Sequence, residues 1–245
     1  SKVLQPKELV NLLGDYFSGM TEIIFKYGGT LDKYVGDAIM AFWNAPTNQS
    51  NHAERSVLAA IEMVEFTKRL SCSFRKKEKL EIRTRIGINS GKAIVGNVGF
   101  KKRFNYTVMG DAVNLASRLE SVNKQYGTFL TISDSIFNYV CDKVHARKLD
   151  VIRVKGEAQP VTIYELLGKN DSSLDTKKHQ VVGAYCQGLE AYNCRYWDTA
   201  IHYFISALQI DPDDGPSKIY LERCKILRDN PPDKSWDGVF NLLSK

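Results

Sequence analysis

The sequence predicts an α+β fold followed by a smaller helical unit. Amphipathic helical stretches and short β-type runs follow one another without strict alternation, which favours a mixed sheet with helices packed on it over a doubly wound one. Two apolar runs flank Gly36-Asp37, as in a two-residue β-hairpin. A polar, turn-rich stretch then precedes a C-terminal region with mainly helical periodicity.

The first half of the chain begins with an amphipathic helix from about residue 6 to 27. Gly28-Gly29 ends this helix. Its apolar positions recur at three- and four-residue steps: Leu9, Leu13, Tyr16, Met20 and Ile23. The hairpin at residues 31–43 follows. Asn51 and Glu54 have the spacing of a capping box, which predicts a second helix to about residue 70.

Alternating residues predict a strand over 82–88, and Asn89-Ser90-Gly91 predicts a turn into a further strand over 92–98. A third helix is expected over 111–126, with Gly127 as its stop. Strands at 129–133, 148–154 and 161–166 and a short helix near 134–140 complete this part.

The predicted hairpin places Asp37 at its tip. For an arbitrary Gly-Asp pair, turn formation alone is a sufficient explanation of the aspartate. Here the strand after it, residues 38–43, is apolar on both faces, which predicts a central buried strand, and Lys33 lies four residues before Asp37. A carboxylate at the end of a buried strand is a common place for a metal ion or a phosphate-bearing substrate.

Composition excludes several classes of protein. The 245 residues are 43% hydrophobic and 25% charged, which is typical of a globular chain. No apolar run approaches the roughly 20 residues of a membrane span, and no signal peptide is visible, so this fragment is expected to make no membrane contact. The five cysteines lack a C-x-x-C spacing, which predicts neither disulfides nor zinc and fits the cytoplasm. The net charge of +6 is spread along the chain, so a small anionic substrate explains it without nucleic acid.

Residues 168–178 are expected to be a linker, followed by a helical unit over 179–245. Five of its residues fall at the spacing of the tetratricopeptide signature, two helices with small residues where they cross: Gly188, Ala200, Phe204, Ala207 and Pro212. A single such hairpin leaves apolar faces uncovered. The aromatic tail, with Trp236 and Phe240, is therefore expected to dock on the hairpin, on the first domain or across a dimer.

Three motifs occur in order along residues 1–167: GGTLDKYVGDAIMAFWNAP, RFNYTVMGDAVNLASRLES and VIRVKGEAQPVTIYEL. Together they resemble the catalytic domain of class III nucleotide cyclases. The resemblance implies a ferredoxin-like sheet with additions. It also implies catalysis with two Mg²⁺ or Mn²⁺ ions, for which Asp37 matches the second metal aspartate. The family's first metal aspartate lies in an F-x-D-I-x-x-F-T strand, which we expect upstream of Ser1; the domain in hand would lack that first strand.

The same resemblance assigns five further residues. Lys33 matches a position that meets the purine, where a donor suits N1 of adenine and guanylate-specific members carry an acid. Thr107 matches the second base-reading position. Asn114 and Arg118 are four residues apart on one helix face, which is also the pattern of polar residues that are simply exposed to solvent. In the family, residues at these positions orient the ribose and stabilise the charged α-phosphoryl group. Lys155 matches the lysine that holds the terminal phosphates.

The implied function is an adenylate cyclase that converts ATP to cyclic AMP and pyrophosphate in intracellular signalling. Metal and phosphate ligands come from different subunits in this family, so a head-to-tail homodimer is implied. A guanylate cyclase is one alternative. Another is a non-catalytic dimerising module whose helical segment binds a protein partner. The order of cyclase domain, helical hairpin and WDGV tail also resembles bacterial cyclases with an upstream extracellular sensor, anchored in the inner membrane.

Overall fold

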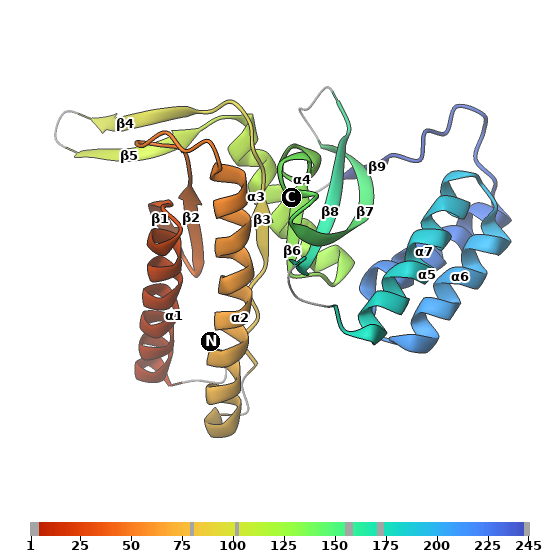
Figure 1. Cartoon of the computed structure of the whole chain (residues 1–245), viewed down its shortest axis with the longest axis horizontal. Helices are drawn as coiled ribbons and strands as arrows, with labels where there is room; N and C mark the ends of the chain where they lie inside the picture. The colour runs from red at the N-terminus through yellow and green to blue at the C-terminus, as the bar shows by residue number, and fades with distance from the viewer. Residues whose placement is uncertain (1–4, 79–80, 101–102, 155–158, 171–173, 243–245) are drawn as a thin grey trace.

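The computed structural model describes residues 5–78, 81–100, 103–154, 159–170 and 174–242. Helices and strands are mixed along the first two thirds of the chain, and helices dominate the remainder (Figure 1). The helices are α1 (Pro6–Lys26), α2 (His52–Glu78), α3 (Asp111–Tyr126), α4 (Asp134–Val140), α5 (Thr176–Asn193), α6 (Trp197–Ile210) and α7 (Gly215–Asp229). The strands are β1 (Thr30–Val35), β2 (Ala38–Phe42), β3 (Ile86–Ile88), β4 (Ile94–Phe100), β5 (Arg103–Met109), β6 (Leu130–Ser133), β7 (Val144–Val154), β8 (Val161–Lys169) and β9 (Phe240–Leu242).

The strands form three separate sheets in the part of the chain that the structure describes. The largest has the order β3-β6-β8-β7-β9, with parallel pairing at both ends and antiparallel pairing within. β1 pairs with β2, and β4 pairs with β5 in a long ribbon that projects from the body (Figure 1). The α+β class is confirmed. In place of the one mixed sheet that was expected, the described strands form one five-stranded sheet and two two-stranded sheets.

The strand at residues 38–42 is not the central buried strand that its apolar sequence predicts. β2 pairs with β1 on one side, and among the described residues no strand pairs with its other edge. Its side chains are accordingly exposed or half-buried. The apolar composition of β2 does not by itself supply the second neighbour that full burial requires.

The strand expected after the turn at residues 89–91 is present as β4. It pairs with β5, a strand that was not predicted, whereas β3 pairs in parallel with β6. β3 is also shorter than the alternation over 82–88 predicts. Its partner β6 is only four residues long, and three of these pair with β3. Strand length is thus set by the partner and not by the pattern alone.

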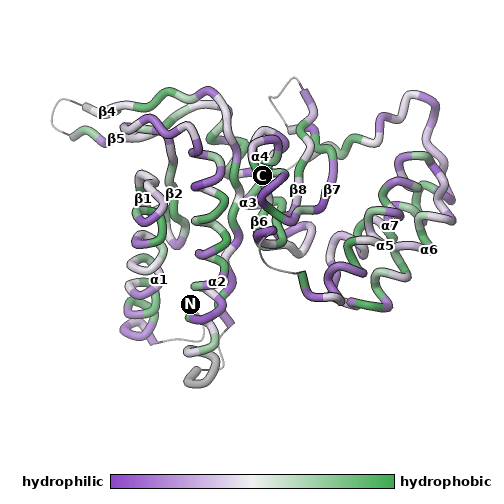
Figure 2. The backbone as a smooth tube through the Cα atoms, in the orientation of Figure 1, coloured by the Kyte–Doolittle hydropathy of each residue, from purple (hydrophilic) through white to green (hydrophobic). Residues whose placement is uncertain are grey.

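Helix α3 lies at the centre of the molecule, between the short parallel strands and the C-terminal helices. Its inner face carries Leu115, Leu119 and Val122 into a core that also contains residues of β7, β8 and α5–α7. Its buried residue Asn123 donates to Ile86 O at 3.0 Å and accepts from Thr131 Oγ1 at 2.7 Å, which ties the helix to both β3 and β6. Figure 2 shows hydrophobic and hydrophilic stretches alternating along the helices, as one-sided burial requires.

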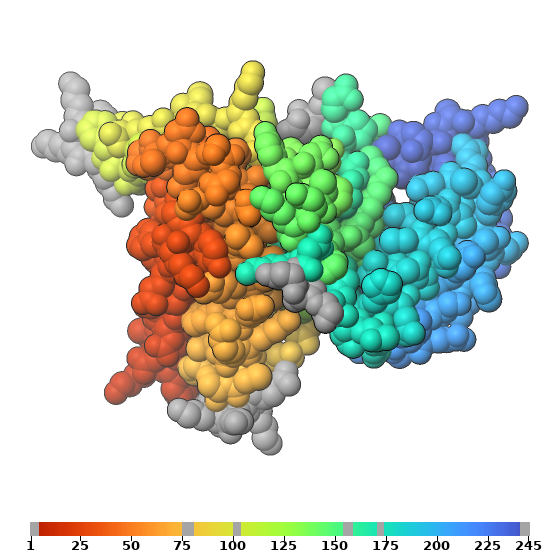
Figure 3. Space-filling view, viewed as in Figure 1, coloured from red at the N-terminus to blue at the C-terminus, as the bar shows by residue number. Residues whose placement is uncertain are grey.

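The C-terminal helices pack directly on the first domain, and Figure 3 shows the two parts in contact. Ala200, Phe204 and Ala207 are fully buried, as their spacing predicts for a helix crossing. β8 continues to Lys169 and α5 begins at Thr176, so the connection is shorter than the predicted linker of residues 168–178. No helix in the described ranges combines the length and the hydropathy needed to cross a membrane.

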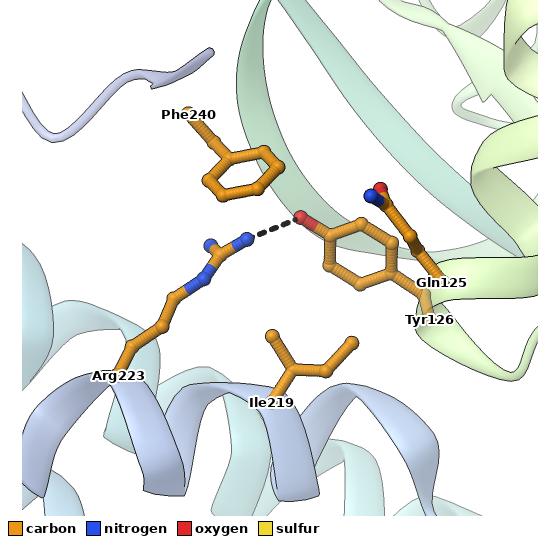
Figure 4. Close-up of a pocket in the computed structure, with 5 residues that line it drawn as sticks. All are labelled: Gln125, Tyr126, Ile219, Arg223 and Phe240. Carbon is orange, nitrogen blue, oxygen red and sulfur yellow. Dashed lines mark hydrogen bonds between the residues drawn. The ribbon is translucent and has the colours of Figure 1, made fainter. Parts of the chain in front are cut away.

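The aromatic tail is docked, as the sequence predicts. Trp236 packs edge-on against Tyr192 and Trp197, each at 5.5 Å between ring centroids, and β9 adds in parallel to β7. The Arg223 guanidinium lies 4.1 Å from the Phe240 ring and donates to the Tyr126 hydroxyl at 3.0 Å (Figure 4). These residues line an open pocket of about 250 Å³ where α3, α7 and β9 meet. The tail therefore covers apolar surface of both the helices and the sheet.

Candidate active site

The β1–β2 hairpin presents Asp37 as predicted. Gly36 has a positive φ of 64°, the left-handed conformation that such turns require, and Val35 pairs with Ala38 across it. Asp37 lines a small pocket of about 120 Å³ together with Tyr16 of α1 and Thr84. Burial raises the pKa of Tyr16, and the nearby Asp37 charge raises it further. An exposed carboxylate therefore faces a shallow pocket between the hairpin and α1.

The two residues predicted to read the purine are in direct contact. Lys33 on β1 donates from Nζ to Oγ1 of Thr107 on β5 at 3.1 Å, although 74 positions separate them in the sequence. Thr107 is buried, whereas the Lys33 side chain is 42% exposed. An ammonium that is fixed at one side and open to solvent at the other can still donate to a ligand.

A third residue belongs to this contact and was missed by the sequence analysis. The Asp32 side chain is fully buried, and its Oδ2 accepts from Thr107 Oγ1 at 2.6 Å and from Val108 N at 3.4 Å. Regular alternation along a strand would place Asp32 on the face opposite to Lys33. No Gly or Pro marks an irregularity within residues 30–35, so this arrangement has no signal in the sequence.

Helix α3 presents Asn114 in its first turn and Arg118 one turn later, on the same face. Asn114 is exposed and Arg118 is half-buried. The start of the helix is held by Asn89, which follows β3 and donates from Nδ2 to Ala112 O at 3.0 Å. Because β5 leads into α3, Thr107 precedes Asn114 by only seven residues. The base-reading contact and the polar face of α3 are thus positioned by one continuous segment.

The predicted metal and phosphate ligands are less complete. Lys155 lies outside the described residues. Within the described ranges, no group of three or more His, Cys, Asp or Glu side chains is arranged to hold a metal ion. Asp37 alone does not fit a two-ion site.

Comparison with known protein families shows what the domain of residues 1–168 is similar to. Residues 1–168 match the model of the adenylate and guanylate cyclase catalytic domain. The chain belongs to this family. Adenylate cyclase 1 of Rhizobium meliloti is 39% identical over 163 residues, which are 66% of this chain and 24% of that protein. The first three curated relatives are much longer, since the chain spans 24%, 10% and 34% of their lengths.

Solved cyclase structures share the fold. The adenylyl cyclase CyaB from P. aeruginosa has a TM-score of 0.64 and 35% identity, covering 70% of this chain and 89% of that one. The guanylyl cyclase Cya2 has a TM-score of 0.62 and 33% identity, covering 69% and 85%. Both purine specificities therefore occur among cyclases of similar structure, and the overall fold does not separate them.

Proposed function

We propose that this protein is an adenylate cyclase, which converts ATP to 3′,5′-cyclic AMP and pyrophosphate in intracellular signalling. The observation that carries the choice of purine is the contact between Lys33 and Thr107. Adenine offers an acceptor at N1 and a donor at its 6-amino group, and the Lys33 ammonium is a donor that cannot accept. N1 of guanine carries a proton and is a donor, and the ammonium cannot accept a hydrogen bond from it.

The reaction joins the ribose 3′-oxygen to the α-phosphorus, releases pyrophosphate and frees the 3′-hydroxyl proton. In this proposal Asn114 orients the ribose and Arg118 stabilises the charge that develops on the α-phosphoryl group, a role suited to a planar guanidinium. Lys155 holds the terminal phosphates. Asp37 would supply one of the ligands of the divalent ions, Mg²⁺ or Mn²⁺, which when bound would neutralise phosphate charge.

We also propose a head-to-tail homodimer, in which Asp37 of one chain and Arg118 of the other serve the same site. The β4–β5 ribbon supports this, because it projects from the body and exposes large apolar side chains: Ile94, Val98, Phe104 and Met109. The C-terminal helices, α5–α7, are proposed as a tetratricopeptide-like assembly element that could also receive a protein partner.

Initial rates with ATP and with GTP, in Mg²⁺ and in Mn²⁺, test the proposal. Cyclic AMP is the expected product, and Lys33→Glu should lower turnover of ATP because it replaces the donor to N1 with an acceptor. Arg118→Ala should lower kcat by about 10²- to 10³-fold. Lys68→Glu on α2 is a charge reversal at an exposed side chain, and it should leave the initial rates with ATP and with GTP unchanged.

A protein that prefers GTP would support guanylate cyclase activity instead, the alternative that similarity to guanylyl cyclase Cya2 favours. A folded protein that forms neither cyclic nucleotide would contradict catalysis and favour a signalling module.

A further inference from the structure

Asp32 is a buried carboxylate directly beneath the residues that face the purine. Its side chain is 0% exposed, and Oδ1 has no hydrogen-bond partner among the residues that the structure describes. Lys33 Nζ lies 3.3 Å from Oδ1, close enough for an ion pair but without hydrogen-bond geometry. A buried acceptor left without a hydrogen bond costs about 1–3 kcal/mol. Stability alone therefore gives little reason for a carboxylate at this position.

A β-bulge explains why Asp32 and Lys33 reach the same partner. Leu31 pairs with Ala41 and Lys33 pairs with Met40, so two positions on β1 correspond to one on β2 and Asp32 is left unpaired. Such an extra residue interrupts the alternation of side chains and redirects them. The Asp32 carboxylate and the Lys33 ammonium thereby converge on the Thr107 hydroxyl from one strand.

These contacts decide where the proton of the Thr107 hydroxyl points. A carboxylate can only accept a hydrogen bond, so Thr107 donates its single proton to Asp32 Oδ2. An ammonium can only donate, so Thr107 accepts from Lys33. One lone pair of the hydroxyl remains. Toward a ligand, Thr107 is consequently an acceptor only, and Lys33 is a donor only.

We propose that Asp32 is a positioning residue that sets purine specificity by fixing this donor and acceptor pattern. The pattern is complementary to a 6-aminopurine, whose N1 accepts and whose 6-amino group donates. It opposes a 6-oxopurine, in which both polarities are reversed. The inference rests on the proposed function, since it takes Lys33 and Thr107 as the base-reading pair, and it adds the residue that orients them.

Asp32→Asn is the informative substitution because it keeps the size of the side chain. The amide of Asn can donate to Thr107, which frees the hydroxyl proton and removes the acceptor-only state. Calorimetric titration with 3′-deoxy-ATP and 3′-deoxy-GTP measures base preference without the reaction, because neither nucleotide can cyclise. We expect the unmodified protein to prefer 3′-deoxy-ATP and Asp32→Asn to reduce that preference about tenfold, the worth of one hydrogen bond between neutral groups.

Asp15→Asn on α1 is the matched control, since that carboxylate is exposed. It should leave the preference unchanged. A ratio of affinities in Asp32→Asn within twofold of the unmodified protein would show that Asp32 is purely structural and overturn the proposal. So would a preference of the unmodified protein for 3′-deoxy-GTP.

A second measurement needs no substitution and covers the case in which Asp32→Asn does not fold. Purine riboside triphosphate lacks the 6-amino group, and its 3′-deoxy form should bind the unmodified protein about tenfold more weakly than 3′-deoxy-ATP. Equal binding would overturn the inference. If the binding preferences are as expected but no cyclic AMP forms from ATP, the proposed catalytic function fails while the role of Asp32 stands.

Discussion

Arg147 on β7 and Asp214 at the start of α7 form a buried bidentate ion pair. Arg147 Nη2 lies 2.6 Å from Oδ1 and Nη1 lies 3.1 Å from Oδ2, and each side chain is 1% exposed. Arg147 also donates from Nε to Glu165 Oε2 at 2.6 Å and lies over the Tyr185 ring of α5. The C-terminal helices are therefore joined to the cyclase domain by paired charges as well as by apolar contact.

Removing the charge of Asp214 should destabilise the whole chain. Asp214→Asn leaves the buried Arg147 guanidinium with one carboxylate partner, Glu165, and removes the negative charge from the start of α7, where Asp214 Oδ2 accepts from Ser217 N at 3.2 Å. We expect a loss of about 3 kcal/mol in the free energy of unfolding, measured by urea titration. Asp213→Asn is the control, because that side chain is 97% exposed, and it should change stability by less than about 0.5 kcal/mol. An equal loss of unfolding free energy in Asp213→Asn and Asp214→Asn would contradict the prediction.

The same pair predicts a dependence of stability on pH. Burial alone would raise the pKa of Asp214, but hydrogen bonds and charge from Arg147 outweigh it, so the pKa lies below the ordinary 3.8. A lowered folded-state pKa contributes stability that is fully present above the unfolded value and is lost as pH falls through the folded value. Thermal unfolding scans should therefore show extra acid destabilisation below about pH 4 that Asp214→Asn lacks. Parallel pH profiles of the two proteins would argue against it.

Gly87 on β3 lets α3 approach the sheet. A Cβ there would lie 2.3 Å from both Ala116 O and Glu120 N, which are backbone atoms of the helix that carries Asn114 and Arg118. Gly87→Ala should shift α3, cost about 1–3 kcal/mol and lower cyclase activity per folded molecule. The control is Gly183→Ala on α5, where a Cβ would meet no described atom within 4 Å beyond its own helix backbone, and alanine should stabilise the helix slightly. Unchanged kcat in Gly87→Ala would contradict tight coupling of α3 to β3.

Trp236 anchors the tail through Tyr192, Trp197 and the Arg195 guanidinium, which lies 5.2 Å from the Trp236 ring centroid. Trp236→Ala should lower the free energy of unfolding by about 2 kcal/mol, less than for a fully buried tryptophan because this one is half-buried. Activity per folded molecule should not change. Ile226→Ala on α7, at a side chain 62% exposed, is the comparison and should be nearly neutral. A melting temperature unaffected by Trp236→Ala would indicate a tail that awaits another partner.

The shared-site dimer predicts complementation between two inactive variants. Asp37→Ala and Arg118→Ala should each be nearly inactive, yet a mixture should regain partial activity, because a mixed dimer contains one intact site. Cyclic AMP formation after mixing, with subunit exchange shown by differently tagged chains, measures this. Exchange without recovery would place both residues in one subunit's site.

Local patterns predicted much of the fold. The ends of α1, α3 and α4 follow from apolar periodicity and from Gly127, which ends α3 with a positive φ of 67°. The Gly36-Asp37 turn is likewise a local property, since positive φ is available to glycine at low cost. The three motifs that indicate a cyclase are also local. They identified Lys33, Thr107, Asn114 and Arg118 as candidates before any contact between them was visible.

Strand pairing was not decided locally. The alternation over residues 82–98 is compatible with a hairpin, but β3 pairs with β6 and β4 with β5, because a strand needs a partner whose hydrogen-bonding groups are free and in register. β5 was missed for the same reason. The sequence predicted that the tail docks but not where, and neither the pairing of β9 with β7 nor the contact of Arg147 with Asp214 has a local signature.

The sequence by itself determined the family, the helices and the chemistry of each candidate residue, because these depend on residue types at fixed spacings. Only the tertiary structure decided which candidates meet. It brought Lys33 to Thr107 across 74 positions, and it placed Asp32 beneath them through a bulge that breaks the alternation of β1. The physical reason is that a bulge depends on the register between two strands, which no single segment specifies, whereas the burial of a carboxylate depends on everything packed around it.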